Sequence, residues 1–516
     1  MNKIVSLLLA ILMVVTMVAF VGCGNDTPNT PDTPDTPSTP DTPDTPTEPE
    51  DPADARIPLE LPERYYMSSS GEKEPFHIIE WTVSGAKDAG AGWIPWHEGD
   101  ATEEEGDLMS NAVFARNAFV EEQYGVEITQ EYVNVNANDH FLRLQQDNQS
   151  GENGIQLVTT RALHAWDFAS SGLLHDMADV GEGILHFDQP WWVQDAVESY
   201  TLGDSLFVCS TEMLLRDKGA TAALYFNTKL ADDYQLGDLY ALVESGDWTV
   251  ETMASAAEVV ATSLDGNDLL DSGRDQWGIL GADDMSYFLF AAMDQKFGFI
   301  NEDGYLEMTF GTEDGITTMQ YIFENVMYAD WYHNNYVTPF TEENAGFEDD
   351  RGLFCSSLIK SAYTGLREME TPYGVLPMPK ADSAQEDYRS LVWVHHDSVL
   401  GIPSAVYDEE MACIILEALS YEGYYTVTPV LLDTLIYGRL AKTQEARDSF
   451  ERIFNTRVYD AGQYWGYTRD GLVDGNSSVL RHTATGTSNM MSVWETHRNS
   501  TEAQVDKVNT FIDGIR

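Results

Sequence analysis

Apolar and polar residues alternate along the chain with the two periods that predict helices and strands. The clearest helix follows a β-rich run at 224–226 and the turn Gly246-Asp247. Its apolar residues recur at the spacing of one buried helix face: Val250, Met253, Ala254, Ala257, Val260 and Ala261. Thr249 is the predicted N-cap of this helix, and Glu251 places negative charge in its first turn, where the helix dipole favours it.

The same analysis predicts an alternation of strands and helices further upstream. Strands are expected at 76–83, 126–133 and 154–160, and helices at 108–124 and 139–149. A strand, a helix and a second strand in this order favour a parallel pair joined by a right-handed crossover. We therefore expect an α/β fold.

The N-terminus has the composition of a targeting segment and a linker. Lys3 precedes the apolar run 4–21, and Gly22-Cys23 follows, which is the pattern of a secretory signal. The cysteine at the cut site resembles a bacterial lipobox, so residues 1–22 are expected to be a lipoprotein signal peptide and Cys23 the lipidated residue. An uncleaved membrane anchor is the alternative, because the run is long enough to span a bilayer. The Asp/Thr/Pro repeats within 23–73 predict an extended linker.

Composition limits what the remaining residues can do. About 440 residues exceed one simple core, which favours two lobes. The net charge of −58, from 86 acidic residues against 28 Lys and Arg, argues against nucleic acid and anionic lipid as partners. Apart from Cys23 the cysteines are odd in number, Cys209, Cys355 and Cys413, so we expect buried free thiols rather than a disulfide framework.

The segment 223–261 resembles the extracellular solute-binding proteins of ABC sugar importers, the family 1 type. The residues that match the family pattern are Leu224, Tyr225, Asn227, Lys229, Leu230, Asp247, Trp248, Thr249 and Met253. Upstream matches are Phe119, Tyr124, Gly125, Val126, Ile128, Ala169, Gly172, Leu174 and Met177. Downstream, 373–380 (YGVLPMPK) is similar to another family segment, so the resemblance extends in order from about residue 74 to residue 421.

This resemblance implies a two-lobe periplasmic-binding-protein-like fold of type II within 74–516, with a ligand cleft between the lobes. The segment 203–208 is expected to be the strand before the crossing to lobe 2, and 347–357 the strand that returns to lobe 1. Lobe 1 is then predicted to comprise 74–205 and 347–400, and lobe 2 to comprise 206–346 and 401–516.

The resemblance also implies a function. The protein is expected to be a lipid-anchored monomer on the extracellular face of a bacterial membrane. It would capture a carbohydrate, in particular an oligosaccharide, and deliver it to the permease subunits of an ABC transporter. Hinge closure around the ligand would be its mechanism. The alternatives are a surface glycan-degrading enzyme and a sensor or adhesin that does not transport. An anionic ligand would need a locally placed base such as Arg161.

Aromatic and polar residues in loops beside the predicted strands are the candidates for the ligand site; most follow a strand, whereas Trp277 follows the acidic turn and Trp393 and His395 precede the strand 398–403. Sugars present apolar CH faces and polar hydroxyl edges, so their sites combine flat rings with hydrogen-bonding groups. In open α/β sheets such residues converge at the carboxyl ends of the strands. The candidates are Trp93, Trp96, His97, Arg161, His164, Trp166, Glu212, Trp277, Asp283, Trp393 and His395.

The sequence also bears on metal binding and on catalysis. Closely spaced oxygen-bearing residues could hold a structural calcium ion: Asp265, Asn267, Asp271 and Asp275. The EF-hand pattern is not met, so an ordinary acidic turn is the alternative, and no other cofactor is expected. The sequence contains no H-E-x-x-H, G-x-S-x-G or phosphate-loop signature, which favours a binding protein over an enzyme.

Overall fold

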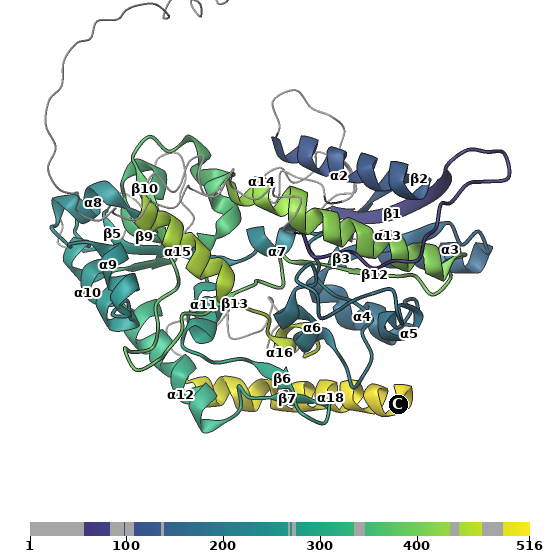
Figure 1. The fold of residues 1–516 in the computed structure, drawn as a ribbon. Coiled ribbons are helices and arrows are strands. Elements are labelled where there is room, and N and C mark those ends of the chain that lie inside the picture. Colours follow the sequence, from purple (N-terminus) through teal and green to yellow (C-terminus); the bar gives the residue numbers. More distant parts are fainter. Residues whose placement is uncertain are drawn as a thin grey trace, which may run out of the picture. The chain divides into compact units, whose positions relative to one another are not determined.

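The computed structural model describes residues 56–82, 98, 108–135, 139–266, 269–270, 275–334, 346–433, 443–466 and 489–516. The chain divides into two compact units, Met1–Ile57 and Pro58–Arg516. Nearly all of the described residues belong to the second unit, and the account that follows concerns that unit alone. Within it, two separate β-sheets are each covered by helices (Figure 1).

The first sheet contains the predicted N-terminal strands. Its described strands are β1 (Glu74–Thr82), β2 (Val126–Asn134), β3 (Ile155–Arg161) and β12 (Ser398–Gly401), in the order β12-β3-β1-β2. β1 runs parallel to β2 and β3, whereas β12 is antiparallel to β3. The helix α2 (Leu108–Tyr124) connects β1 to β2, so the predicted crossover pair is confirmed.

The second sheet comprises β4 (Ala222–Asn227), β5 (Trp277–Gly281), β8 (Tyr332–Asn334), β9 (Gly352–Leu358) and β10 (Tyr373–Leu376) among the described residues. Their order is β10-β4-β9-β5-β8. β5, β8 and β9 are parallel to one another, and β4 runs antiparallel to both β9 and β10.

The remaining elements are helices and short strand pairs. The helices of the first half are α3 (Asp139–Ser150), η3 (Ala162–His164), α4 (Ala165–Ser170), α5 (Met177–Val180), α6 (Gln194–Tyr200), α7 (Arg216–Gly219), α8 (Thr228–Asp233), α9 (Leu239–Ser245) and α10 (Val250–Val260). Those of the second half include α11 (Met285–Ala292), α12 (Glu313–Ile322), η4 (Phe323–Met327), η5 (Phe347–Asp349), η6 (Ile359–Ala362), η7 (Gly365–Glu368), α13 (Glu409–Glu422), η8 (Gly423–Val427), α14 (Thr428–Leu432), α15 (Gln444–Asn455), α16 (Ala461–Tyr464) and α18 (Met490–Ile515). β6 (Gly298–Ile300) pairs with β7 (Leu306–Met308), and β11 (Ser390–Leu391) pairs with β13 (Arg457–Val458).

The start of α10 has the predicted cap. The Thr249 side chain accepts the N–H of Thr252, and the Thr252 hydroxyl accepts the N–H of Thr249 at 2.8 Å, which completes a capping box. The preceding Trp248 is buried and donates its indole N–H to the Pro377 carbonyl at 2.9 Å. The cap therefore also fastens α10 to the loop after β10.

Strand pairing corrects the predicted lobe boundaries. β9 does not return to the first lobe: it is the central strand of the second sheet, between β4 and β5. β10 is also in the second sheet. Of the strands in the range 347–400, only β12 belongs to the sheet of the first lobe. Conversely α13, placed in lobe 2 by the prediction, packs against α2 and β3 of the first lobe. The segment 203–208 is not a strand: it begins with a turn between Leu202 and Ser205, which form an isolated bridge, and Cys209 after it forms an isolated bridge with Leu400.

Two of the segments that pass between the lobes are bonded to each other. We refer to 209–221 as the first crossing segment and 391–398 as the second. The Trp393 N–H donates to the Ala220 carbonyl at 2.9 Å, and Thr221 forms an isolated bridge with Val392. The second segment is tied to the first lobe as well, because the Ala162 N–H donates to the Asp397 carbonyl at 3.1 Å.

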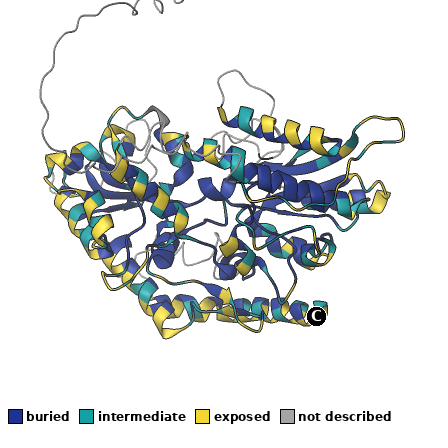
Figure 2. Cartoon of the chain, viewed as in Figure 1, coloured by how far each residue is buried: buried dark blue, intermediate teal, exposed yellow. Residues whose placement is uncertain are grey.

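Buried side chains occupy the space between each sheet and its helices, and they continue through the crossing segments (Figure 2). Cys209 and Cys413 are buried free thiols, as predicted, and Cys355 is a partly buried one. Among the described residues, no helix has the length and apolar character that a membrane crossing requires.

The C-terminal helix α18 contacts both halves of this unit. It has 26 residues and passes beneath the crossing segments in the view of Figure 1. Near its start, Met490 donates its N–H to Gln320 of α12 at 2.8 Å. Near its end, the ring of Phe511 packs edge-on against Trp166 of α4, with centroids 5.7 Å apart.

Candidate functional site

In each sheet, the edge formed by the carboxyl ends of the parallel strands lies next to the crossing segments. Because β1 and β3 are parallel and β12 is antiparallel to β3, one edge carries the ends of β1 and β3, with Trp81 and Arg161, and the start of β12. The corresponding edge of the second sheet carries the ends of β5, β8 and β9, followed by Asp283 and Lys360. We call the region between these edges the junction. Carboxyl ends of strands and domain interfaces are the usual positions of ligand sites.

The first crossing segment is fixed to the first sheet by Arg216 of α7. Its guanidinium donates to the Trp81 carbonyl at 2.8 Å and to Glu80 Oε1 at 3.2 Å. Glu98 Oε1 accepts the backbone N–H of Arg216 at 2.9 Å and that of Leu215 at 2.8 Å. Both carboxylates are fully buried. Burial raises the pKa of Glu98, and the charge of Arg216 opposes that increase.

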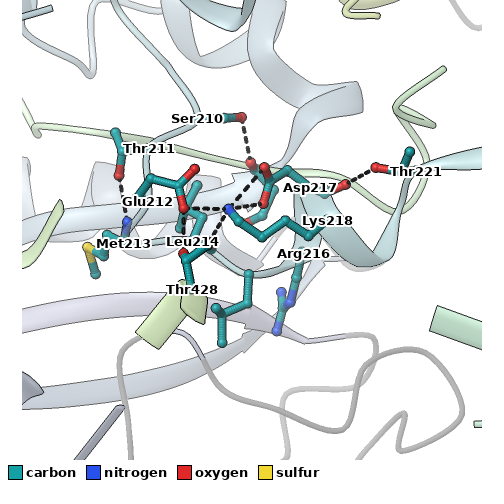
Figure 3. A network of polar contacts seen from close by, with 12 residues as sticks. Ser210, Thr211, Glu212, Met213, Leu214, Arg216, Asp217, Lys218, Thr221 and Thr428 are labelled. Atoms are coloured by element: carbon teal, nitrogen blue, oxygen red, sulfur yellow. Dashed lines mark hydrogen bonds and ion pairs between the residues drawn. The ribbon is translucent and has the colours of Figure 1, made fainter. Parts of the chain in front are cut away.

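The same crossing segment contains a second buried polar network (Figure 3). Lys218 lies 3.1 Å from Glu212 Oε2 and 3.2 Å from Asp217 Oδ1, and Arg457 lies 2.6 Å from Asp217 Oδ2. Burial acts to raise the pKa of Asp217, but Lys218 and Arg457 outweigh it and hold the pKa below its usual value. Thr428 of α14 donates its hydroxyl to Glu212 at 2.5 Å. Glu212 is thus a bridging residue of the crossing segment.

Basic side chains from both lobes gather at the junction. Lys360 Nζ lies 2.9 Å from Nδ1 of His396 on the second crossing segment. Burial lowers the pKa of Lys360 to about 8, with Asp284 raising it and Arg161 lowering it further. The pKa of His395 falls to about 4 through burial and the nearby charges of Arg161 and His164. Burial and the charge of Lys360 lower the pKa of His396 as well. His395 and His396 are therefore neutral at pH 7, and each can donate one hydrogen bond and accept another.

Two adjacent aspartates, Asp283 and Asp284, directly precede α11, and Lys360 is a charged neighbour of Asp284. Asp283 is buried and its Oδ1 accepts the side-chain amide of Asn334 at 2.5 Å. Burial and the neighbouring Asp283 raise the pKa of Asp284 to about 6. The junction thus brings carboxylates, imidazoles and cationic groups together. Sugar hydroxyls can donate hydrogen bonds to the first two kinds of group and accept them from the last two.

The predicted tryptophans lie in different environments. Trp393 is on the second crossing segment, where its ring packs against Tyr287, Phe288 and His395. Trp166 is half-buried on α4 against Phe511.

Trp277 does not lie at the junction. It is the first residue of β5 and pairs with Gly352 at the start of β9, so it is at the opposite edge of the second sheet. Its ring packs against His333, with centroids 4.6 Å apart. The prediction that Trp277 converges with the other candidates is therefore wrong, because this tryptophan begins its strand instead of following one.

The structure thus brings Arg161, His164, Asp283, Trp393 and His395 together around the junction. Other predicted residues lie outside the described residues: Cys23, Trp93, Trp96, His97, Asn267 and Asp271. Of the remaining calcium candidates, Asp275 Oδ1 accepts the Leu264 N–H and Asp265 Oδ1 accepts the Ser263 hydroxyl. No group of three or more His, Cys, Asp or Glu suited to a metal ion occurs in the described part of the chain.

Sequence reasoning missed three junction residues: Trp81, Arg216 and Lys360. Lys360 follows β9, which the sequence analysis places in the other lobe. Trp81 is the penultimate residue of β1, where the apolar pattern indicates a core position. Arg216 lies in a short helix within a segment that carries no periodic pattern.

Comparison with solved structures identifies the architecture. An ABC substrate-binding protein from Listeria monocytogenes in complex with cycloalternan aligns with a TM-score of 0.51 and 12% identity, over 86% of this chain and 100% of that chain. A galacto-N-biose-/lacto-N-biose I-binding protein from Bifidobacterium longum gives 0.52 and 12%, over 86% and 99%. A cyclic alpha-maltosyl-1,6-maltose binding protein from Arthrobacter globiformis gives 0.52 and 10%, over 84% and 100%. The chain has the fold of an ABC-importer solute-binding protein.

Within this solute-binding-protein fold, the junction is the region between the two lobes, at the carboxyl ends of strands from both sheets. No protein-family model and no curated protein sequence matches the chain.

Proposed function

We propose that the protein captures a carbohydrate at the junction and delivers it to an ABC permease, while a lipid on Cys23 holds it on the extracellular face of the membrane. One observation carries the proposal: the carboxyl ends of strands from two sheets meet at the junction, in a fold shared with two proteins named for the sugars they bind and with a third in complex with cycloalternan. The polar groups at this place, among them Arg161, His395 and Asp283, suit hydroxyl-rich ligands.

The proposed mechanism is binding without bond cleavage. The lobes rotate about the two crossing segments, and closure surrounds the sugar with groups from both sheets. The Arg216 and Lys218 networks keep the first crossing segment attached to its lobe during this rotation. The permease then recognises the closed form.

A thermal-shift screen tests the capture step. The purified protein is heated with maltose, maltotetraose, cycloalternan, lacto-N-biose and other mono- and oligosaccharides, and with peptides and polyamines as controls. A bound sugar stabilises the native state by mass action and raises Tm by several degrees. A rise restricted to one class of sugar, which is recovered intact, is the expected result. No rise with any sugar overturns the proposal.

Recovery of cleaved sugar would favour the glycan-degrading alternative. Asp283 and Asp284 are the carboxylates at the junction that an enzyme could use. Chromatography of the sugar after long incubation separates the two outcomes, because a receptor returns its ligand unchanged.

Anchoring and delivery need separate measurements. The Cys23→Ala variant is expected to leave the membrane fraction and appear in the medium, whereas the wild type incorporates labelled fatty acid. Uptake of the labelled sugar should fall when either the protein or its permease is deleted. Binding without any effect on uptake would favour a sensor or adhesin.

A further inference from the structure

A cavity beside the junction has the chemistry of a separate sugar subsite. It has a volume of about 390 Å³, within the range of ~300–1,000 Å³ that is typical of small-molecule sites. Its lining includes His140 and Phe141 from the first turn of α3, His164 from η3, and Asp167 and Phe168 from α4. Because α3 follows β2 and η3 follows β3, the cavity lies at the same sheet edge as Arg161.

His140 is the residue that points to a ligand. Its side chain is fully buried, yet neither ring nitrogen has a hydrogen-bond partner in the described structure. A buried polar atom without a partner lowers folding stability, so folded proteins rarely retain one without a use. Its ring stacks on Phe168 with centroids 5.0 Å apart, which fixes its orientation on the cavity wall.

The charge state of His140 indicates the class of ligand. Burial lowers the pKa of His140 to about 3, and the charges of His164 and Arg161 add to this effect. The imidazole is therefore neutral at physiological pH and offers one donor and one acceptor, as a hydroxyl group does. The exposed carboxylate of Asp167 can accept hydrogen bonds from hydroxyl groups, and its negative charge repels anions. Phe141 and Phe168 supply apolar rings for the CH face of a sugar.

His164 connects the cavity to the junction. Its ring lies 5.1 Å from that of His140, and its charge also lowers the pKa of His395 on the second crossing segment. A ligand that contacts both His395 and His140 must extend past His164. This requires more than one sugar ring.

We propose that this cavity is a second subsite that binds a neutral ring of an oligosaccharide whose other ring occupies the junction. The inference rests on the proposed function and adds to it the position of the second ring, its lack of charge and a minimum length of two rings.

The His140→Phe substitution gives the most direct test. Phenylalanine keeps a planar aromatic ring against Phe168 and removes both ring nitrogens. Tm of the ligand-free variant is expected to equal or exceed that of the wild type, because buried unpartnered polar atoms are lost. Kd for maltotetraose, measured by calorimetry, is expected to rise at least tenfold, while Kd for a monosaccharide of the same series changes less than twofold. If another series stabilises the wild type in the screen, its mono- and tetrasaccharide replace glucose and maltotetraose.

A matched pair of variants controls for charge. Asp167→Asn and Asp179→Asn both remove an exposed carboxylate from a short helix of the first lobe, and only Asp167 lines the cavity. Tetrasaccharide affinity should fall several-fold in the first variant and stay unchanged in the second.

Failure of the subsite and failure of the proposed function give different results. Unaltered tetrasaccharide affinity in His140→Phe overturns the subsite and leaves carbohydrate capture standing. A large loss of Tm in that variant assigns His140 a structural role and also overturns it. A wild type that binds no sugar overturns both proposals.

Discussion

Arg216 lies over the ring of Trp81, with its guanidinium carbon 4.2 Å from the ring centroid, and donates to the Trp81 carbonyl at 2.8 Å. The contact joins α7 on the first crossing segment to the end of β1. It holds the start of the crossing against the sheet edge that carries Arg161, whose guanidinium carbon lies 5.2 Å from the same ring. The two arginines thus share one indole.

Removal of the Arg216 side chain should lower the free energy of unfolding substantially. Arg216→Met leaves Glu80 and Glu98 buried with one cation fewer, and loss of one partner of a buried ion pair costs about 3–5 kcal/mol. Urea denaturation should show this loss in the free energy of unfolding. Arg64→Met is the control, because the Arg64–Glu410 pair is exposed to solvent and should contribute little to stability. Equal effects in the two variants would contradict the role assigned to Arg216.

The cap of α10 gives a smaller and local effect. Thr249→Ala removes the acceptor for the Thr252 N–H and should lower the free energy of unfolding by about 1 kcal/mol, within a range of roughly 0.5–2. Thr249→Ser retains the hydroxyl and should lose much less. Chemical denaturation compares the three proteins, and similar losses in Ala and Ser variants would rule out the hydroxyl as the cause.

Lys360 predicts a pH dependence of stability. Its folded-state pKa is lowered to about 8 from 10.5, mainly by burial, with Asp284, Arg161 and His396 as its charged or titratable neighbours. Between these two values the unfolded chain binds more protons than the folded one, so the contribution of Lys360 to stability rises with pH. Below about pH 8 the lysine is charged in both states and its contribution is constant and unfavourable.

The comparison with Lys360→Met isolates this effect. Other groups titrate in both proteins, so their contributions cancel in the difference. The free energy of unfolding of the wild type, relative to the variant, should increase between about pH 8 and pH 10.5. A flat or falling difference over this window would show that burial does not lower the pKa of Lys360.

Arg161 should affect binding more than folding. If it donates to a bound sugar, Arg161→Gln should raise Kd at least tenfold, which corresponds to about 1.4 kcal/mol. Arg389→Gln is the control, since Arg389 pairs with Asp294 and Asp387 on the surface. Calorimetric titration with the best sugar of the screen measures both. An unchanged Kd in Arg161→Gln would remove this residue from the site.

Local elements of the fold could be predicted from the sequence because their causes are local. The bounds of α2 match the predicted 108–124, and the Thr249 cap of α10 is where the polar and apolar pattern indicates. Period and capping depend on residues within a few positions of each other.

Strand order could not be predicted in the same way. The apolar run of β9 predicts a strand, but only pairing with β4 and β5, which lie far away in the chain, decides which sheet contains it. The error in placing β9 also hid Lys360. Trp277 shows a related limit. An apolar run predicts a strand, but it does not reveal which end of that strand lies at the junction.

The helix α18 sets a geometric condition on any motion of the lobes. A helix of 26 residues is about 39 Å long, and its contacts with Gln320 and Trp166, which are made by Met490 and Phe511, hold distant parts of the molecule about 32 Å apart. A helix that is attached at both ends prevents the lobes from separating along its axis. The motion that remains is rotation of the lobes about that axis. Opening must then be asymmetric, wide on the side away from α18 and narrow beside it.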